Sequence, residues 1–240
     1  MAQTHVQSRE PSSAVSSSDP GAGAGALSAW HSRRAWVLLL VATAVLLVID
    51  LASKSWAFAK IADAPVVVNR EDVLAGGPLY RLIPPHEPVV ILPKLLEFTL
   101  VLNPGAVFGL GAGQRGTFIV FTIGAFVFAL WMFRAWTGPR DRVAHLGLAL
   151  LLSGGLGNLY DRLMFACVRD FIHPLPHVVL PFGWSYPWGS RSGAREIWPY
   201  VSNLADLFLI VGIILLVWHT WKSGGRAHGS TEPSPSPNAA

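Results

Sequence analysis

The sequence contains few charged residues and only one cysteine. Asp, Glu, Lys and Arg make up 13% of its 240 residues, whereas about 25% is typical of a soluble domain. The single cysteine, Cys167, excludes an internal disulfide and any metal site built from several thiolates. The formal charge of +4 is spread along the chain, with no basic run interleaved with aromatic residues. We therefore expect neither a disulfide-rich domain nor a nucleic-acid-binding protein.

Apolar residues are abundant instead. They account for 52% of the chain, which has a mean hydropathy of +0.44. They gather in four segments, 35–58, 117–136, 143–160 and 201–221, each of a length that crosses the hydrocarbon core as a helix. The composition predicts an integral membrane protein of one compact domain. We expect the first segment to be an uncleaved signal anchor, because no apolar signal-peptide core precedes residue 35.

Basic residues set the expected orientation of these spans. They flank the start of the first segment, the short loop between the second and third, and the end of the fourth: Arg33, Arg34, Arg134, Arg140, Arg142, Lys222 and Arg226. By the positive-inside rule these regions are cytoplasmic, so both termini are predicted to be cytoplasmic. The low-complexity tails 1–30 and 223–240 are expected to be disordered around a membrane domain at 31–222.

The two outer loops differ in composition. The first, about 60–116, contains short β-prone runs at 65–68, 88–92 and 94–103, separated by Pro and Gly. The expected fold is therefore a membrane all-α protein of four transmembrane helices, with a small extracytoplasmic β-sheet between helices 1 and 2. The second outer loop, 161–200, carries Trp184, Tyr186, Trp188 and Trp198. Such aromatic rings favour the headgroup layer of a membrane.

With this topology, the polar residues near the spans all fall on the outer side. They are Asp50, Lys54, Asn103, Asn158, Asp161, Arg162, Asp170, Asn203 and Asp206. Ionisable groups at membrane depth cost several kcal/mol, so they are functional candidates by default. The inner halves of the spans carry almost none. We expect this rim to hold the functional site.

The spacing of these residues predicts which of them act together. Asp50 and Lys54 are four apart and share a helix face, which fits both an ion pair at a helix end, with Lys54 reaching the interface, and a functional role. For Asp161, a surface ion pair with Arg162 is the favoured interpretation. Asp206 lies among apolar residues and must face an interior or a wet cavity. Two carboxylates close together in a low dielectric share one proton and can activate water, but the spacing alone leaves the reaction open.

Five motifs occur in a fixed order along the chain. They are Asp50-x-x-x-Lys54, Asn103-Pro-Gly-Ala-Val-Phe108, Gly154-Gly-x-Gly-Asn158-x-x-Asp161-Arg162, Val168-x-Asp170-Phe171-Ile172 and Asn203-Leu-Ala-Asp206. Together, on a frame of four spans, they resemble the lipoprotein signal peptidase (signal peptidase II) family over about 36–221.

This resemblance implies an aspartic endopeptidase of the bacterial inner (cytoplasmic) membrane, with its active site at the outer face. It would remove signal peptides from diacylglyceryl-modified prolipoproteins, cutting before the lipidated cysteine, with no metal or cofactor. Asp170 and Asp206 would be catalytic. The implied supporting residues are Asn158, Arg162 and Asn203 around the pair, Asn103 and Gly105 at the outer sheet, and Asp50 and Lys54 at the first span. The expected partners are these precursors and membrane lipid, and the expected state is a monomer.

The sequence departs from the family pattern at three places. Ser202 stands where an aromatic residue usually precedes the Asn, and Leu207-Phe208 follows Asp206 where a small residue is commoner. The stretches 61–93 and 174–199 lengthen both outer loops. The motif acids are all present.

Three other functions compete with this interpretation. A metalloprotease site could use Asp170, His173 and His177, although Pro174 and Pro176 break the helix that would align them. A proton-coupled transporter would place its acids near the midplane, with internal repeats, and neither feature is found in the sequence. A non-catalytic scaffold gives no reason to keep both Asp170 and Asp206.

Overall fold

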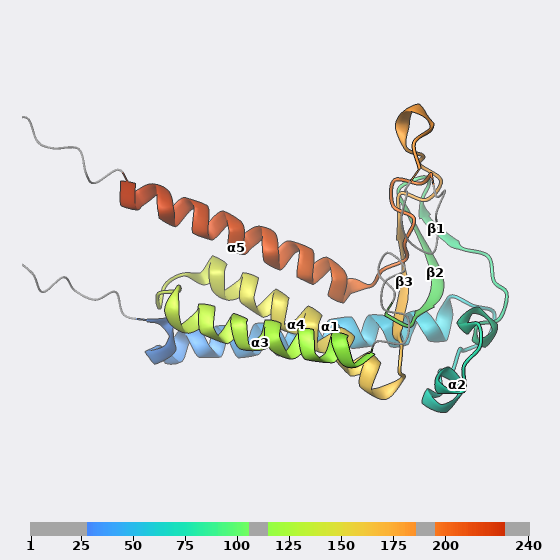
Figure 1. Cartoon of the computed structure of the whole chain (residues 1–240), viewed down its shortest axis with the longest axis horizontal. Helices are drawn as coiled ribbons and strands as arrows, with labels where there is room; N and C mark the ends of the chain where they lie inside the picture. Colours follow the sequence, from blue (N-terminus) through green and yellow to red (C-terminus); the bar gives the residue numbers. More distant parts are fainter. Residues whose placement is uncertain (1–27, 106–114, 186–194, 229–240) are drawn as a thin grey trace, which may run out of the picture.

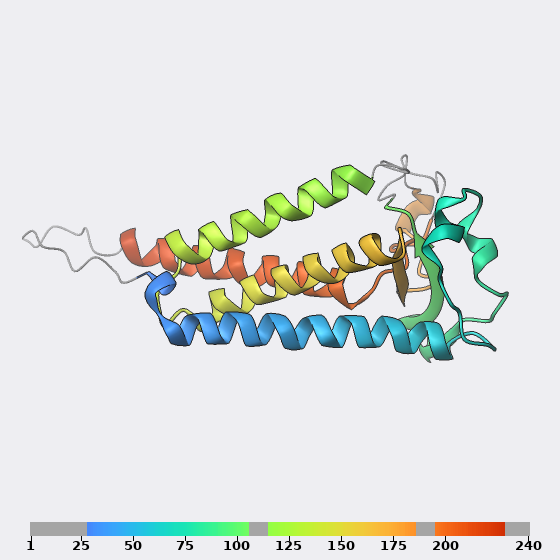
Figure 2. The same ribbon diagram turned by 90° about the horizontal axis from the view of Figure 1, so that it is seen from below.

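Four long helices form the body of the molecule. The computed structural model describes residues 28–105, 115–185 and 195–228. The helices are α1 (Arg33–Lys60), α3 (Arg115–Ala135), α4 (Arg142–Met164) and α5 (Leu204–His228), and they run side by side along the long axis (Figures 1 and 2). Each contains a stretch long and apolar enough to cross a membrane. A helix able to cross a membrane therefore stands at each of the four predicted spans, and α5 extends past the predicted boundary at 222.

Helix α4 is the inner helix of the bundle. In its apolar stretch 61% of the residues are buried inside the molecule, compared with 22% in α1 and 17% in α3 and α5. The large apolar side chains of the other three helices are largely exposed, as membrane-facing residues are. Glycines let α5 approach α4 closely, since a Cβ at Gly154 would lie 2.5 Å from the carbonyl oxygen of Ala205. This close approach brings the beginning of α5 against the end of α4.

One end of the bundle, here called the loop end, holds the beginning of α1 and the α3–α4 connection. A 3₁₀ turn, η1 (Ala29–His31), precedes α1 there, and the backbone N–H of Ala29 donates to the carbonyl of Thr137. The ring of Trp36 packs edge-on against Trp30 and Phe133. Residues 28–30 therefore belong to the folded structure, although the predicted tail included them.

A three-stranded antiparallel sheet covers the opposite end, here called the sheet end (Figure 1). Its order is β1 (Val89–Leu92), β2 (Leu96–Asn103) and β3 (Val168–Pro174). The sequence prediction placed the whole sheet between the first two spans. Two strands lie there, but the third comes from the segment after α4 and carries Asp170. The register aligns Val101 with Asp170, so the sheet joins two segments far apart in the chain.

The remaining segments of the first long loop fold differently from the prediction. The run 65–68 was expected to be a strand, but it makes no sheet pairing in the part of the chain that the structure describes. The N–H of Val66 instead donates to Phe58 at the end of α1. A short helix, α2 (Arg70–Leu74), and a 3₁₀ turn, η2 (Leu79–Leu82), follow, and a third such turn, η3 (Pro181–Gly183), lies in the second long loop.

Some predictions concern residues outside the described part of the chain. These are the tail residues 1–27 and 229–240, the last three residues of the Asn103–Phe108 motif, and the aromatic residues Tyr186 and Trp188.

Candidate active site

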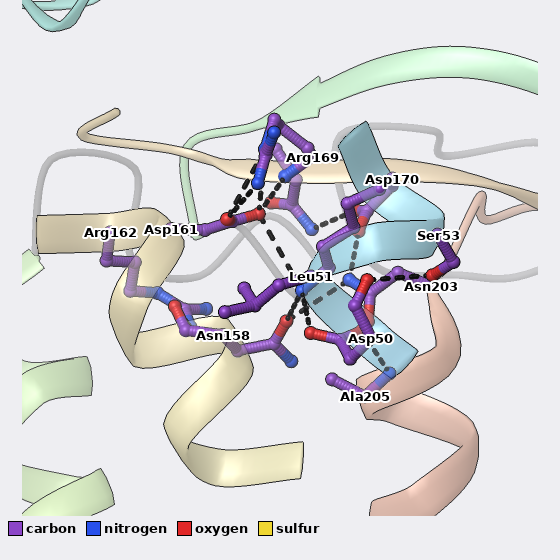
Figure 3. A network of polar contacts seen from close by, with 12 residues as sticks. Asp50, Leu51, Ser53, Asn158, Asp161, Arg162, Arg169, Asp170, Asn203 and Ala205 are labelled. Atoms are coloured by element: carbon purple, nitrogen blue, oxygen red, sulfur yellow. Dashed lines mark hydrogen bonds and ion pairs between the residues drawn. The ribbon is translucent and has the colours of Figure 1, made fainter. Parts of the chain in front are cut away.

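Polar side chains from α1, α4, β3 and the beginning of α5 meet at the sheet end of the bundle (Figure 3), where Asn103 of β2 joins them. They include every polar residue that the sequence placed at one rim. Their burial is deep for so polar a group: Asp50, Lys54 and Asp161 have no exposed surface, and Asp170 and Asn203 are 1% exposed. Such a cluster is stable only if its members satisfy one another.

Asp170 lies on β3 with both carboxylate oxygens occupied. Oδ1 accepts a hydrogen bond from Nδ2 of Asn203 at 2.6 Å. Oδ2 accepts one from Nδ2 of Asn103 at 3.1 Å, and Asn103 lies at the end of the neighbouring strand β2. The sheet pairing thus fixes the Asn103 contact, while Asn203 connects Asp170 to α5.

Asp206 lies in the first turn of α5, in a reciprocal cap with Asn203. The side chain of Asn203 accepts from the backbone N–H of Asp206 at 3.2 Å, and Asp206 Oδ2 accepts from the N–H of Asn203 at 3.2 Å. This is the capping-box pattern, in which two side chains satisfy the free N–H groups at a helix start. The three-residue spacing seen in the sequence is therefore that of a helix cap.

Asn158 of α4 completes the link between the two carboxylates. Its Nδ2 donates to Asp206 Oδ1 at 2.8 Å, and its Oδ1 accepts from Nδ2 of Asn203 at 3.2 Å. Asp170 and Asp206 are thus joined through the side chains of Asn158 and Asn203. The structure brings together these two acids from separate parts of the chain.

Asp50 and Lys54 form the expected ion pair, but they lie in the interior. Their charged groups are 2.9 Å apart, and Nζ of Lys54 also donates to Asn158 Oδ1 at 3.1 Å. Asp50 Oδ1 accepts from the N–H of Ala205 at 2.9 Å, so α1 holds the beginning of α5. Lys54 does not reach the interface as one interpretation of the sequence had it, because its ammonium group is bound between three polar side chains.

The interpretation of Asp161 as a surface partner of Arg162 was wrong. Asp161 is fully buried and pairs instead with Arg169 of β3, whose Nη2 lies 2.9 Å from Oδ1 and whose backbone N–H donates to Oδ2 at 3.0 Å. Lys54 lies 3.6 Å from the same carboxylate. Sequence reasoning missed Arg169, although a charged residue inside an apolar strand, directly before Asp170, was a usable signal.

Arg162 points to a cavity between α3, α4 and the start of α5. Its Nη1 donates to the carbonyl of Asn158 at 3.2 Å, its guanidinium lies 4.8 Å from the ring centre of Phe118, and its buried Nε has no hydrogen-bond partner. The cavity is about 300 Å³ and mostly apolar, with Thr122, Asn158, Arg162 and Asp206 as its polar members. It can therefore take an apolar segment and present that segment to polar groups.

Gly105 fits a position that a side chain would disturb. Its φ is +101°, and a Cβ there would lie 2.9 Å from the ring of Phe118. Its N–H donates to Oδ1 of Asn103 at 2.9 Å, which orients the amide that binds Asp170. Gly105 thus connects the outer sheet to the Phe118 wall of the cavity.

Burial changes the acidity of Asp170. Loss of water around the carboxyl group, and next the nearby charge of Asp206, raise the pKa of Asp170 to about 8. Hydrogen bonds from Asn203 and Asn103 act in the opposite direction but are smaller. Burial therefore favours the protonated form of Asp170, and the pair of acids can hold a proton between them.

The residues of the competing metal site do not converge. His173 and His177 both lie near Glu196, at 3.5 Å and 3.6 Å, and His173 lies 2.8 Å from Glu97. Asp170 does not join them, because it contacts the two asparagines instead. Within the ranges that the structure describes, no group of three His, Cys, Asp or Glu residues is placed to hold a metal ion.

Ser202, the departure before Asn203, joins α5 to the sheet. Its N–H donates to the carbonyl of Ile172 at 2.8 Å, and its carbonyl accepts from the N–H groups of Phe171 and Ile172. Backbone pairing therefore holds this position. Leu207, the other departure, is 49% exposed on α5.

Comparisons with known proteins agree on a family. The family model described as "Signal peptidase (SPase) II" matches residues 41–222. The lipoprotein signal peptidase of an Anaeromyxobacter species is 30% identical over 215 residues, covering 83% of this chain and 94% of that protein. The one of Moorella thermoacetica is 34% identical over 142 residues, covering 59% and 79%.

A solved structure shares the fold. A bacterial membrane enzyme superimposes with a TM-score of 0.54 at 19% identity, covering 82% of this chain and 94% of that one. The family match spans most of the chain and includes every residue of the polar cluster described above. The chain therefore belongs to the signal peptidase II family of peptidases.

Proposed function

We propose that this protein is a membrane aspartic endopeptidase that removes signal peptides from diacylglyceryl-modified prolipoproteins, cutting before the lipidated cysteine. The observation that carries the proposal is the pair Asp170 and Asp206, held at one end of the bundle by the shared amides of Asn158 and Asn203. Membership of the signal peptidase II family supports a peptidase that acts on lipoprotein precursors.

The protonation of the pair supports a division of roles. Asp170, with its pKa raised to about 8, carries the proton and donates a hydrogen bond to the scissile carbonyl oxygen. Asp206 lines the cavity and takes a proton from the attacking water as its oxygen bonds to the carbonyl carbon. In the same step Asp170 passes its proton to the carbonyl oxygen, which gives a neutral tetrahedral intermediate. When this intermediate collapses, the C–N bond breaks, Asp206 passes its proton to the leaving amine, and the hydroxyl returns its proton to Asp170 as the C=O bond re-forms.

The cavity supports a pose for the signal peptide. Its apolar walls, which include Phe121, Ala125 and Leu152, suit the hydrophobic segment of a signal peptide. The guanidinium of Arg162 lines the cavity and would donate to a substrate backbone carbonyl. The other polar residues hold the two acids in place. Asn158 and Asn203 position both carboxylates. Asn103 and Gly105 hold Asp170 from the sheet side, and Asp50 and Lys54 fix the start of α5.

The proposed location follows from the distribution of charge. Arg33, Arg34, Arg140 and Arg142 lie at the loop end, which we assign to the cytoplasm by the positive-inside rule. The carboxylates then face the outer side of the bacterial inner membrane, where a lipidated precursor presents its cleavage site. The enzyme is proposed to act as a monomer in contact with membrane lipid and without a metal, a cofactor or nucleic acid.

A pair of matched substrates tests this function. Purified protein is incubated with a diacylglyceryl-modified precursor and with the same precursor lacking the lipid, and mass spectrometry locates any cut. We expect cleavage of the lipidated form alone, directly before the modified cysteine, with full activity in excess chelator. Equal cleavage of both precursors would contradict the substrate assignment, and activity lost to chelator and restored by zinc would contradict the aspartic mechanism.

A further inference from the structure

A basic cavity lies at the loop end, away from the two carboxylates. It has a volume of about 350 Å³ and opens between the beginning of α1 and the α3–α4 connection. Arg34, Arg140 and Arg142 line it, together with the ring of His145 from α4. Its volume is at the lower end of the range for small-molecule sites, about 300–1,000 Å³.

The three guanidinium groups of this cavity pair with no acid in the part of the chain that the structure describes. Over the described residues, the ion pairs include none with Arg34, Arg140 or Arg142. The one acid of the connecting loop, Asp141, accepts from the N–H of Gly138 at 2.7 Å and lies 3.8 Å from His219. Asp141 lines a neighbouring cavity, which Arg140 and Arg142 also line. Among the described residues no acid lines the basic cavity itself, so this cavity is rich in positive charge.

His145 lines this cavity with a buried ring whose two nitrogens lack well-formed hydrogen bonds. The residue is only 1% exposed, its ring packs edge-on against Phe133 with the centres 5.3 Å apart, and neither ring nitrogen makes a hydrogen bond. The backbone of Gly138 approaches the ring without forming a hydrogen bond of good geometry, and Asp141 and His219 act on the ring through their charges. A buried ring without a well-formed hydrogen bond is costly, and a ligand that reached the ring from the cavity would lower that cost.

An apolar groove continues from this cavity along α1. Arg34 and Leu38 line both, and the groove extends over Val37, Val41 and Val45, which are 52–56% exposed. It runs along the axis of a helix that we treat as spanning the membrane. Together they form a cationic pocket from which an apolar groove extends along α1, parallel to the direction that a lipid acyl chain takes in the membrane.

We propose that the cavity and groove bind an anionic phospholipid of the leaflet at the loop end. The phosphate would lie among Arg34, Arg140 and Arg142, because a planar guanidinium binds phosphate oxygens in a bidentate manner. His145 would donate to the same headgroup, and one acyl chain would lie on Val37, Val41 and Val45. Basic pockets between transmembrane helices bind anionic headgroups in this way. The site is independent of the proposed peptidase activity, since it lies at the other end of the bundle.

Native mass spectrometry of the full chain in detergent tests the proposal. Phosphatidylglycerol is titrated against the protein, with phosphatidylcholine of the same acyl chains and soluble glycerol 3-phosphate as comparison ligands. We expect saturable binding of one phosphatidylglycerol, at least about tenfold tighter than either comparison ligand. Phosphatidylcholine binding equally well would overturn the role of the charges, and glycerol 3-phosphate binding equally well would overturn the role of the groove.

Two double variants of equal charge locate the site. Arg140→Gln with Arg142→Gln should weaken phosphatidylglycerol binding at least about tenfold. Arg81→Gln with Lys94→Gln removes the same charge from the sheet end and should leave binding unchanged. Equal losses in the two, or no loss in the first, would overturn the assignment.

A third variant keeps the charge of the loop intact. His145→Phe preserves the ring packing against Phe133 and should still weaken lipid binding about two- to tenfold. This variant tests phospholipid binding at the cavity even if the arginine variant fails to insert. Unchanged affinity in His145→Phe, with an unchanged melting temperature, would remove His145 from the site and overturn the proposal. Lipid occupancy is read from mass, so the result does not depend on cleavage of any precursor.

Discussion

At the scale of single residues, Asn158 and Asn203 organise the charges of the sheet end. Each uses both ends of its amide: the NH₂ group donates to a carboxylate, and the oxygen accepts from a neighbouring donor. An amide cannot ionise, so these contacts orient Asp170 and Asp206 at any pH. The protonation state of the pair is therefore determined by burial and by the repulsion between the two carboxylates.

The raised pKa of Asp170 predicts a pH limit on activity. The proposed mechanism needs the Asp170 proton, which is present below its pKa of about 8 and lost as the pH rises through that value. We expect kcat/KM to fall on the alkaline side, with a midpoint near pH 8, in a titration with purified protein and lipidated precursor. Activity that stays level up to pH 10 would contradict the assigned role of Asp170.

Arg169 is predicted to stabilise the site through Asp161. Removing one partner of a buried ion pair costs about 3–5 kcal/mol. Asp161 has no exposed surface, and without Arg169 its remaining charged neighbour is Lys54 at 3.6 Å. We expect Arg169→Gln to lower the free energy of unfolding by about this amount. The double variant with Asp161→Asn should cost less than the sum of the single changes, and strict additivity in this cycle would contradict direct pairing.

Single residues also mark the limit of sequence reasoning. The i, i+4 spacing of Asp50 and Lys54 was sufficient to predict their ion pair. It gave no indication that Lys54 is buried against Asn158 and Asp161, because those contacts come from another helix. The pairing of Asp161 with Arg169 was likewise hidden, since a contact eight residues apart depends on how β3 turns back after α4.

At the scale of elements, the helices were predictable and the sheet only in part. Each span begins and ends within a few residues of its prediction, except at the end of α5, because a membrane demands a long uninterrupted apolar run. Strands β1 and β2 follow from local β-prone composition. Strand β3 has a similar composition, but its place beside β2 is a long-range pairing that no local pattern specifies. The run 65–68 failed as a strand because it lacks a partner.

Packing of α5 on α4 is predicted to depend on glycine. A Cβ at Gly154 would lie 2.5 Å from the backbone oxygen of Ala205, which cannot move without shifting α5. We expect Gly154→Ala to lower the free energy of unfolding by about 1–3 kcal/mol, measured by unfolding in detergent. Gly124 of α3 is the control, since a Cβ there meets nothing within 4 Å. Equal effects of the two changes would contradict the close approach of α4 and α5.

At the scale of the whole molecule, polar groups are sorted between the two ends. The sheet end buries a network of acids, amides and two cations, whereas the loop end exposes unpaired arginines. The sequence predicted this sorting because the positive-inside rule and the positions of the acids agree. It did not predict the cavity and groove at the loop end, which exist only once α1 lies beside the α3–α4 connection.

The proposed orientation predicts which positions are accessible from outside the cell. Cys167 is fully buried, so the natural chain should resist labelling by a membrane-impermeant maleimide. Phe182 is 91% exposed in the second long loop, and Phe182→Cys should label on intact spheroplasts. Ser223→Cys, near the end of α5, should label only after permeabilisation. The reverse pattern would invert the topology and place the carboxylates on the cytoplasmic side.

The most direct measurement compares precursor cleavage by wild type with cleavage by Asp170→Asn, Asp206→Asn and Asp63→Asn. Asp63 is an exposed acid just beyond α1, so it controls for loss of one carboxylate. The account predicts that each of the first two changes abolishes cleavage, a loss of at least about 100-fold, in protein that still inserts, while Asp63→Asn cuts at the wild-type rate. Cleavage at the wild-type rate by a double Asp170→Asn, Asp206→Asn variant would contradict it.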